Sequence, residues 1–479
     1  MRTKRTYFLL ITVTVLLTAC KSEPKNEPTI AGIWQSLGYG KILTIEEDSY
    51  AFYDRTKISC LPVQQGKIAT FGDGLTLLGD TLILAKGTGL YHYKRIPALP
   101  PLCSQPLSEE KRKDPIYNFE VMAQTITAHF AYFKRNNINW DSLYTVSKAK
   151  ITSTTTEAEL YLVLEEIGNT LKDNHGYIEP TDKVYEQAEA LRPAPVADET
   201  TEELEEYGDF PLAKMVAKTF LDEDLTRDTW LMHWGKMKNN VGYLQVKAMW
   251  LYADLNLSDS SIQKHGFVDT YVKAYTALNE TDYIAREAVG AQQIMDKVMK
   301  DLRTCSHIIV DVRFNGGGQD AVSLEILRRF NDQRKQVATK RAVMAAGFTQ
   351  SIPIFLEASA NPYTKPVYLL TSQQSASATD FMALASLELP NIKRIGSHTN
   401  GALSDALEKK LPNGWYFSVS NEVYLDNQGT CYENNGIPVD YELNYPEDRQ
   451  PFFRTVAHDL EKDKADILDA IEKVAGKTK

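Results

Sequence analysis

The sequence has few cysteines, and they show no pattern typical of a metal site. Only five occur in 479 residues, and the four after residue 20 lack the short paired spacings typical of zinc ligands; they are Cys60, Cys103, Cys305 and Cys431. In an oxidising compartment Cys60 could form a disulfide with Cys103. We therefore expect neither a metal ion nor another cofactor.

Positively charged residues are outnumbered by negatively charged ones. The chain has 53 Lys and Arg against 63 Asp and Glu, a formal net charge of -10, and no basic tract. Proteins that bind nucleic acids usually present a basic patch to the phosphates, so nucleic acid is not an expected partner. Apolar residues make up 43% of the chain, which is ample for buried cores, and the length suggests two to four domains.

Long apolar runs are confined to the N-terminus. Basic residues precede an apolar run at 8–17, which is followed by Leu-Thr-Ala-Cys ending at Cys20. The run is too short to cross a bilayer comfortably, and its end resembles the lipobox of bacterial lipoproteins. We expect a signal peptide at 1–20, lipid on Cys20 and a polar tether at 21–28. The rest would be a secreted body held to the bacterial cell envelope by lipid, on the periplasmic face or at the surface.

Residues 29–96 contain short runs of alternating polar and apolar residues separated by Gly and Asp turns. This pattern predicts a small antiparallel β domain. Its aromatic residues, such as Trp34 and Phe52, could line a ligand pocket, but their alternating spacing is more typical of a core. The proline-containing stretch 97–113 is expected to be a linker.

Helical periodicity predicts a helical domain at 114–180. Residues 154–157, Thr-Thr-Thr-Glu, cap a second helix that runs to Leu171 and is followed by His175. A histidine at neutral pH can take a proton from a serine and return it to a leaving amine, so His175 is the candidate general base. The alternative is that His175 only caps the C-terminus of the helix.

Two junctions between a buried strand and a helix carry the chemistry. The first is Ser-Ala-Ser-Ala-Thr-Asp at 375–380, where a serine would be exposed beside converging helix amides. The alternative is that Ser375 and Ser377 merely cap the helix. The second is Asn-Gly-Gly-Gly at 315–318, whose bare amides suit an oxyanion or a phosphate. No Lys-Ser/Thr pair follows the glycines, so this is not a P-loop.

Together the two junctions resemble the tail-specific, or C-terminal processing, serine peptidase family, over roughly residues 115–445. In this family the second serine of Ser-Ala-Ser-Ala is the nucleophile, which implies Ser377. The resemblance further implies an oxyanion hole formed by the amide of Ala378 and one from Gly316 or Gly317. The segment Leu-Lys-Asp-Asn-His ending at His175 resembles the Leu-x-Asp-x-His segment that closes the family's helical domain.

The family has a Ser-Lys branch and a branch resembling the tricorn core, which uses serine, histidine and glutamate. Ala402 stands where the first branch has its lysine. Residues 432–440 resemble the segment that supplies the acid of the second branch, which implies Glu433, although an ordinary loop carboxylate is the alternative. Tricorn has a serine just before its histidine, and Asn174 takes that second-shell position. His398 is a rival base, in the loop after the nucleophile's helix.

We predict a multidomain α/β (α+β) protein with a small antiparallel β domain, a helical cap and an α/β catalytic core. The core, at 240–479, would have a mostly parallel central sheet of the ClpP/crotonase type and a C-terminal helix. The connecting insertion at 181–239 shows no clear PDZ module. The predicted function is an envelope-anchored serine endopeptidase acting on peptides or proteins. The alternatives are a degenerate peptidase that binds peptides, and a lipoprotein that binds another ligand through its β domain.

Overall fold

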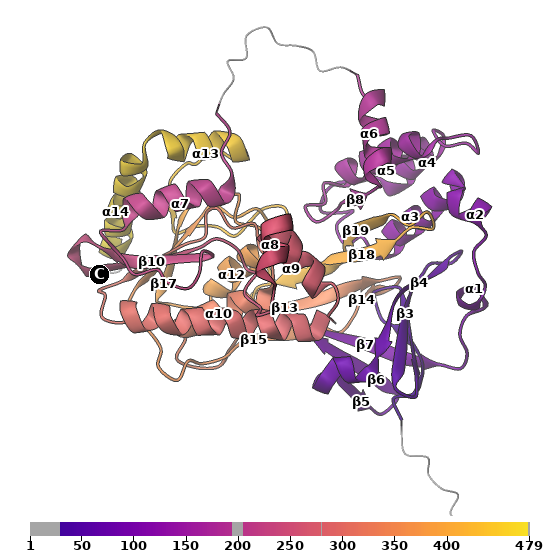
Figure 1. Cartoon of the computed structure of the whole chain (residues 1–479), viewed down its shortest axis with the longest axis horizontal. Coiled ribbons are helices and arrows are strands. Elements are labelled where there is room, and N and C mark those ends of the chain that lie inside the picture. Colours follow the sequence, from indigo (N-terminus) through magenta and orange to yellow (C-terminus); the bar gives the residue numbers. More distant parts are fainter. Residues whose placement is uncertain (1–28, 194–204, 279, 478–479) are drawn as a thin grey trace, which may run out of the picture.

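The computed structural model describes residues 29–193, 205–278 and 280–477. It has three parts in chain order, a β domain, a helical cap and an α/β core, which confirms the predicted fold class (Figure 1). The predicted signal peptide, Cys20 and tether lie outside the described residues. Among the described helices, none combines the length and the apolar character that crossing a membrane requires.

The β domain is one antiparallel sheet of seven strands in the order β4-β3-β2-β1-β7-β6-β5. The strands are β1 (Gly32–Ser36), β2 (Lys41–Glu46), β3 (Ser49–Arg55), β4 (Cys60–Lys67), β5 (Leu75–Leu78), β6 (Thr81–Lys86) and β7 (Gly89–Ile96). Strict alternation along β3 turns Tyr50 and Phe52 inward, and Trp34 is fully buried. These aromatic residues form the core of the domain.

The linker and the cap are largely helical. Their elements are α1 (Pro101–Ser104), α2 (Glu109–Lys113), α3 (Pro115–His129), α4 (Trp140–Lys148), α5 (Glu157–Leu171), β8 (Ile178–Glu179) and α6 (Asp182–Leu191). A disulfide joins Cys60 on β4 to Cys103 on α1, so the linker is fastened to the β domain. Thr156 and Glu159 form a capping box at the start of α5. Lys172 ends α5 in the left-handed conformation, with φ 53°, and this turns the chain toward His175.

The core is organised by a second seven-stranded sheet, in the order β21-β17-β16-β12-β11-β10-β9. The strands are β9 (Glu223–Asp224), β10 (Met232–Met237), β11 (Val241–Val246), β12 (Ile308–Asp311), β16 (Val367–Thr371), β17 (Ile392–Gly396) and β21 (Tyr441–Glu442). Within this sheet β11, β12, β16, β17 and β21 pair in parallel, whereas β9 and β10 are antiparallel. The sheet thus includes two strands upstream of residue 240, because β10 forms a hairpin with β11.

Helices cover both faces of this sheet (Figure 1). One layer contains α10 (Glu280–Leu302), α11 (Asp320–Leu327) and α12 (Ala378–Ser386), and the other contains α7 (Asp209–Phe220), α13 (Arg449–His458) and α14 (Leu460–Lys477). The single C-terminal helix of the prediction is in fact two, because Asp459 leaves helical geometry. Two short helices, α8 (Asp259–His265) and α9 (Phe267–Tyr275), precede α10.

Two smaller sheets complete the core, and one of them also includes a strand of the cap. One contains β13 (Lys335–Met344), β14 (Gly347–Phe348), β15 (Ile352–Leu356) and β20 (Glu422–Leu425). The other pairs β18 (Ala406–Lys410) and β19 (Tyr416–Ser420) of the core with β8 of the cap. Because β8 follows His175 directly, this shared sheet fixes the end of the cap against the core.

Candidate active site

Ser377 and His175 meet at the boundary between cap and core. Ser377 lies after β16, at the start of α12, and His175 lies between α5 and β8. The Ser377 Oγ and the His175 Nε2 are 3.1 Å apart, which is hydrogen-bonding distance, although the residues are 202 positions apart in sequence. The predicted nucleophile and base are therefore brought together.

The backbone at Ser377 is held in a strained conformation. Its φ of 58° and ψ of -122° are rarely adopted by a residue with a side chain. The Ser377 amide donates to Asp380 Oδ2 at 2.8 Å, and Asp380 is fully buried. Because this bond fixes the turn, we interpret Asp380 as the residue that holds the hydroxyl toward His175.

The neighbouring Ser375 is structural. It is fully buried, its hydroxyl donates to Val312 O at 2.9 Å, and the same oxygen accepts from the Ser372 amide at 3.1 Å. Both the donor and the acceptor function of this hydroxyl are thus used within the fold. Of the two serines in the motif, only Ser377 directs its oxygen at a histidine.

The glycine turn packs against the nucleophile. A Cβ added to Gly317 would lie 2.6 Å from the Ser377 Cβ, so no larger residue fits there. The Gly317 amide donates to Asn315 Oδ1 at 2.9 Å and is therefore occupied. Gly316 is exposed, and among the described residues nothing accepts from its amide. Of the two glycines predicted for the oxyanion hole, the geometry favours Gly316, together with Ala378 in the first turn of α12.

Backbone contacts, rather than an acid at its ring, hold His175 in place. Its amide donates to Asp173 Oδ1 at 3.1 Å, and its carbonyl accepts from the hydroxyl of Ser418 on β19. Asp173 also accepts from the Ser420 amide and hydroxyl at 2.8 and 2.6 Å. Burial lowers the pKa of His175, which keeps the ring neutral and able to accept a proton at neutral pH.

The ring nitrogen of His175 that faces away from Ser377 is buried, and no described residue hydrogen bonds to it. Asn174, the predicted second-shell residue, is exposed, and no hydrogen bond to its side chain is found within the described part of the chain. The second-shell role of Asn174 therefore stays a prediction.

Glu433 is buried but contacts neither Ser377 nor His175. Its Oε2 accepts from the amides of Leu403 and Ser404, both at 2.9 Å. The preceding two amides, those of Gly401 and Ala402, donate to Asp380 at 2.8 and 3.0 Å. Two buried carboxylates thus hold four consecutive amides of the segment 401–404.

Burial makes the two carboxyl groups hard to ionise, although the amide hydrogen bonds favour their charged forms. Burial raises the pKa of Glu433 to about 8 and that of Asp380 to about 6, and the two groups also repel one another. The backbone next to these carboxyl groups is closely packed, since a Cβ added to Gly436 would lie 2.0 Å from Thr399 O. The backbone therefore has little room to move. Glu433, the acid that the resemblance implies, thus holds the backbone of the segment 401–404, and its part in the reaction stays a prediction.

Three further residues make no hydrogen bond to Ser377: the rival base His398, Ala402 in place of the lysine of the Ser-Lys branch, and Lys409. His398 contacts the Gln373 side chain and the Thr399 carbonyl, not Ser377. Ala402 is buried, with its amide on Asp380. Lys409 pairs at 2.8 Å with Asp54 of the β domain. None of the three provides a base for Ser377.

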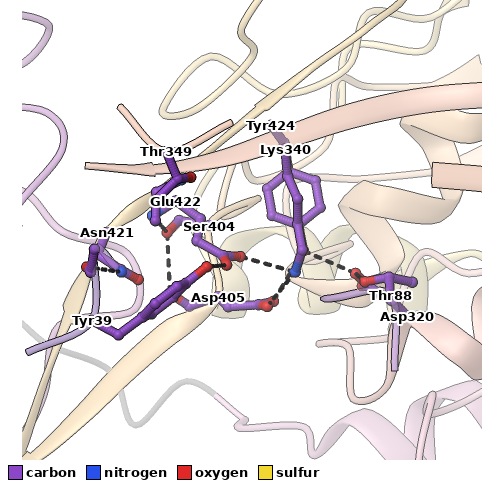
Figure 2. Close-up of polar contacts among 12 residues, drawn as sticks. Tyr39, Thr88, Asp320, Lys340, Thr349, Ser404, Asp405, Asn421, Glu422 and Tyr424 are labelled. Atoms are coloured by element: carbon purple, nitrogen blue, oxygen red, sulfur yellow. Dashed lines mark hydrogen bonds and ion pairs between the residues drawn. The ribbon is translucent and has the colours of Figure 1, made fainter. Parts of the chain in front are cut away.

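A buried charge cluster joins the β domain to the core beside this site. Figure 2 shows Lys340 between Asp405 and Glu422, at 2.8 and 3.0 Å, with Tyr39 of the β domain donating to Glu422 at 2.5 Å. Although burial opposes charge, the two carboxylates hold the pKa of Lys340 well above its ordinary value. On the far side of the cluster, Thr88 donates to Asp320 at 3.1 Å. Together with the Lys409–Asp54 pair, these polar contacts dock the β domain on the core.

All three parts of the protein line one cleft of about 1200 Å³. The core contributes Gly316 and Ala376 from the two catalytic turns, the cap contributes Tyr177, and the β domain contributes Lys41 and Tyr91. The cleft is large enough to hold several residues of an extended peptide.

Sequence reasoning missed three of the residues that shape the site. Asp380 stands three positions after Ser377, which is the spacing of a capping box and was a readable signal. Ser418 and Ser420 hold the His175 turn from β19, and no local pattern marks either residue. Their role depends on strand pairing between cap and core.

Two family models match parts of the chain. Residues 240–443 match the family model of peptidase family S41, and residues 111–169 match that of the tricorn protease C1 domain. None of the curated proteins matches the chain.

Solved structures show the same fold. A protein from Parabacteroides merdae ATCC 43184, named as a candidate peptidase, is 20% identical with a TM-score of 0.51, covering 73% of this chain and 97% of its own. Mature CPAF is 10% identical with a TM-score of 0.51, covering 76% of this chain and 98% of its own.

Proposed function

We propose that this chain, whose residues 240–443 match the family model of peptidase family S41, is a serine peptidase that hydrolyses peptide bonds through an acyl-enzyme formed on Ser377. The observation that carries this proposal is the 3.1 Å contact between Ser377 Oγ and His175 Nε2, beside the amides of Gly316 and Ala378. A nucleophile, a base and an anion-binding pair are the parts that acyl transfer needs.

In the first step Ser377 Oγ attacks the carbonyl carbon of the scissile bond while His175 Nε2 takes the hydroxyl proton. The carbonyl oxygen becomes an oxyanion, which accepts hydrogen bonds from the amides of Gly316 and Ala378. His175 then gives its proton to the leaving amine, and the carbon–nitrogen bond breaks. Water, deprotonated by the same ring, releases the acyl group from Ser377.

Glu433 and Asp380 serve this reaction indirectly in our proposal. Both hold the segment 401–404, and Asp380 also fixes the amide of Ser377. Preorganised geometry matters because a displacement of about 1 Å at a reacting group can cost on the order of a hundredfold in rate. We therefore treat both carboxylates as positioning residues.

The location of the protein is also a proposal. The basic and apolar N-terminal pattern ending in Cys20 supports a lipid-anchored protein of the bacterial cell envelope. The lipid would hold the catalytic cleft near a membrane, within reach of envelope proteins and peptides.

The test uses a fluorophosphonate probe and hydrolysis of casein and quenched peptides. Wild type should be labelled and active, whereas Ser377→Ala should lose both label and activity, and His175→Ala should lose at least a thousandfold in kcat/KM. His398→Ala is the matched control and should retain activity, because His398 does not contact Ser377. Activity that survives Ser377→Ala would overturn the proposal. Peptide binding without labelling or hydrolysis by wild type would favour the degenerate peptidase.

A further inference from the structure

Lys247 is a buried cation of the cleft that the mechanism does not use. Lys247 is 5% exposed and lines the cleft. Its ammonium donates to Trp230 O at 2.8 Å and lies 3.5 Å from His233 Nε2. No carboxylate of the described residues lies within 4 Å of it. Burying an ammonium group without a counter-ion is costly, so its presence needs an explanation.

Other cations of the same cleft are neutralised by the protein. Lys409 and Lys41 both pair with Asp54, at 2.8 and 3.0 Å, and Arg449 pairs with Asp209. Lys247, in contrast, has another cation nearby and no carboxylate partner among the described residues. Burial and the nearby charge of Lys214 lower the pKa of Lys247 to about 8, which still leaves the ammonium mostly charged at pH 7. The site therefore presents positive charge that an anion would stabilise.

The topology places Lys247 near the reacting atoms. Strands β11, β12 and β16 are parallel neighbours, so their carboxyl ends lie at one edge of the sheet. Lys247 follows β11, the glycine turn follows β12, and Ser377 lies beyond the end of β16. Neighbouring strands are about 4.8 Å apart, so the backbone of Lys247 lies on the order of 10 Å from the nucleophile turn. At this distance Lys247 is not placed to act as the base, and His175 already contacts Ser377.

We propose that Lys247 binds a carboxylate of the substrate peptide, about three residues from the scissile bond. The spacing follows because an extended peptide covers about 3.4 Å per residue. The carboxylate could belong to an aspartate or glutamate side chain or to the free C-terminus. The inference rests on the proposed peptidase function, and it assigns a specificity determinant to the same cleft.

The experiment compares fluorescein-labelled peptides that differ in one group only. In one set of pairs, an aspartate is compared with an asparagine at a single position, and the position is moved through the four residues on either side of the scissile bond. In a further pair, a C-terminal acid is compared with a C-terminal amide. Dissociation constants are measured with full-length Ser377→Ala in detergent, and kcat/KM with wild type. The expected result is tenfold to a hundredfold tighter binding of one carboxylate peptide than of its neutral partner.

The variant Lys247→Met should reduce that ratio to about 1 in the Ser377→Ala background, and Lys247→Arg should retain part of it because the charge is kept. Lys218→Met, an exposed lysine on α7, is the matched control and should leave the ratio unchanged. Preference at an internal position identifies a side-chain carboxylate, and preference for the C-terminal acid identifies a chain end. A ratio near 1 for every pair in wild type, or an unchanged ratio in Lys247→Met, overturns the inference.

These outcomes are separate from those of the proposed function. Cleavage that depends on Ser377 but shows no carboxylate preference refutes only the role of Lys247. If wild type cleaves no peptide, the dissociation constants still decide whether Lys247 recognises a carboxylate.

Discussion

Replacing Glu433 with glutamine separates a catalytic acid from a structural clamp. In the structure its Oε2 accepts the amides of Leu403 and Ser404, and a glutamine carbonyl at the same place can accept both. The two hydrogen bonds that hold the segment 401–404 should therefore persist without the charge. We expect Glu433→Gln to keep kcat within about tenfold of wild type, whereas loss of a group that acts in the reaction costs far more.

The same substitution should change how stability depends on pH. Burial raises the pKa of Glu433 to about 8 in the folded protein, against about 4.3 in an unfolded chain. Between these values the folded state binds more protons than the unfolded state, so wild type loses stability as pH rises. At about 1.36 kcal/mol per pH unit, the loss could reach roughly 5 kcal/mol by pH 8. Glutamine has no proton to lose and avoids this loss.

Thermal unfolding from pH 5 to 9 measures the effect. The midpoint of Glu433→Gln should rise relative to wild type as pH increases, by several degrees at pH 8. Glu472→Gln, at an exposed position on α14, should follow the wild-type curve. A variant that is less stable than wild type at pH 8, or folded but a thousandfold less active, would show that the charge of Glu433 is required and refute this reasoning.

Three other predictions test the surroundings of the site. Asp173→Ala frees the turn of His175 from β19, so kcat should fall about tenfold to a hundredfold with KM little changed, as steady-state kinetics would show. Desolvation holds the pKa of the half-buried His175 below its ordinary 6.5, so a pH profile of kcat/KM should reach half of its plateau below pH 6.5. Asp54→Ala leaves the buried Lys409 unpaired and should cost about 3 kcal/mol or more in unfolding free energy, while an unchanged unfolding curve would contradict the buried pair.

Local patterns singled out Ser377 and His175, and the family resemblance made them the predicted nucleophile and base. Ser377 follows an apolar strand and precedes a helix, and His175 follows the end of an amphipathic helix. Their 3.1 Å contact was not derivable from periodicity, since 202 residues separate them. It was implied by the family resemblance, which supplied the long-range pairing that local patterns lack.

Other parts of the site depend on tertiary contacts and were beyond such reasoning. The hydrogen bonds of Glu433 go to backbone amides, which no sequence pattern displays. Lys409 pairs with Asp54 in another domain, a contact that no local pattern indicates. The start of the core sheet was placed too late because β10 is short and contains polar residues.

The cleft walls explain why the β domain matters to a peptidase whose reacting groups lie elsewhere. Glu422 begins β20 and accepts from Tyr39 of the β domain, while Ser420, two residues earlier, holds Asp173 and thereby the turn of His175. Docking of the β domain and placement of the base therefore act on one short stretch of backbone. Tyr39→Phe should loosen that docking and lower kcat more than it lowers substrate affinity, because the contact it removes supports His175 rather than the peptide.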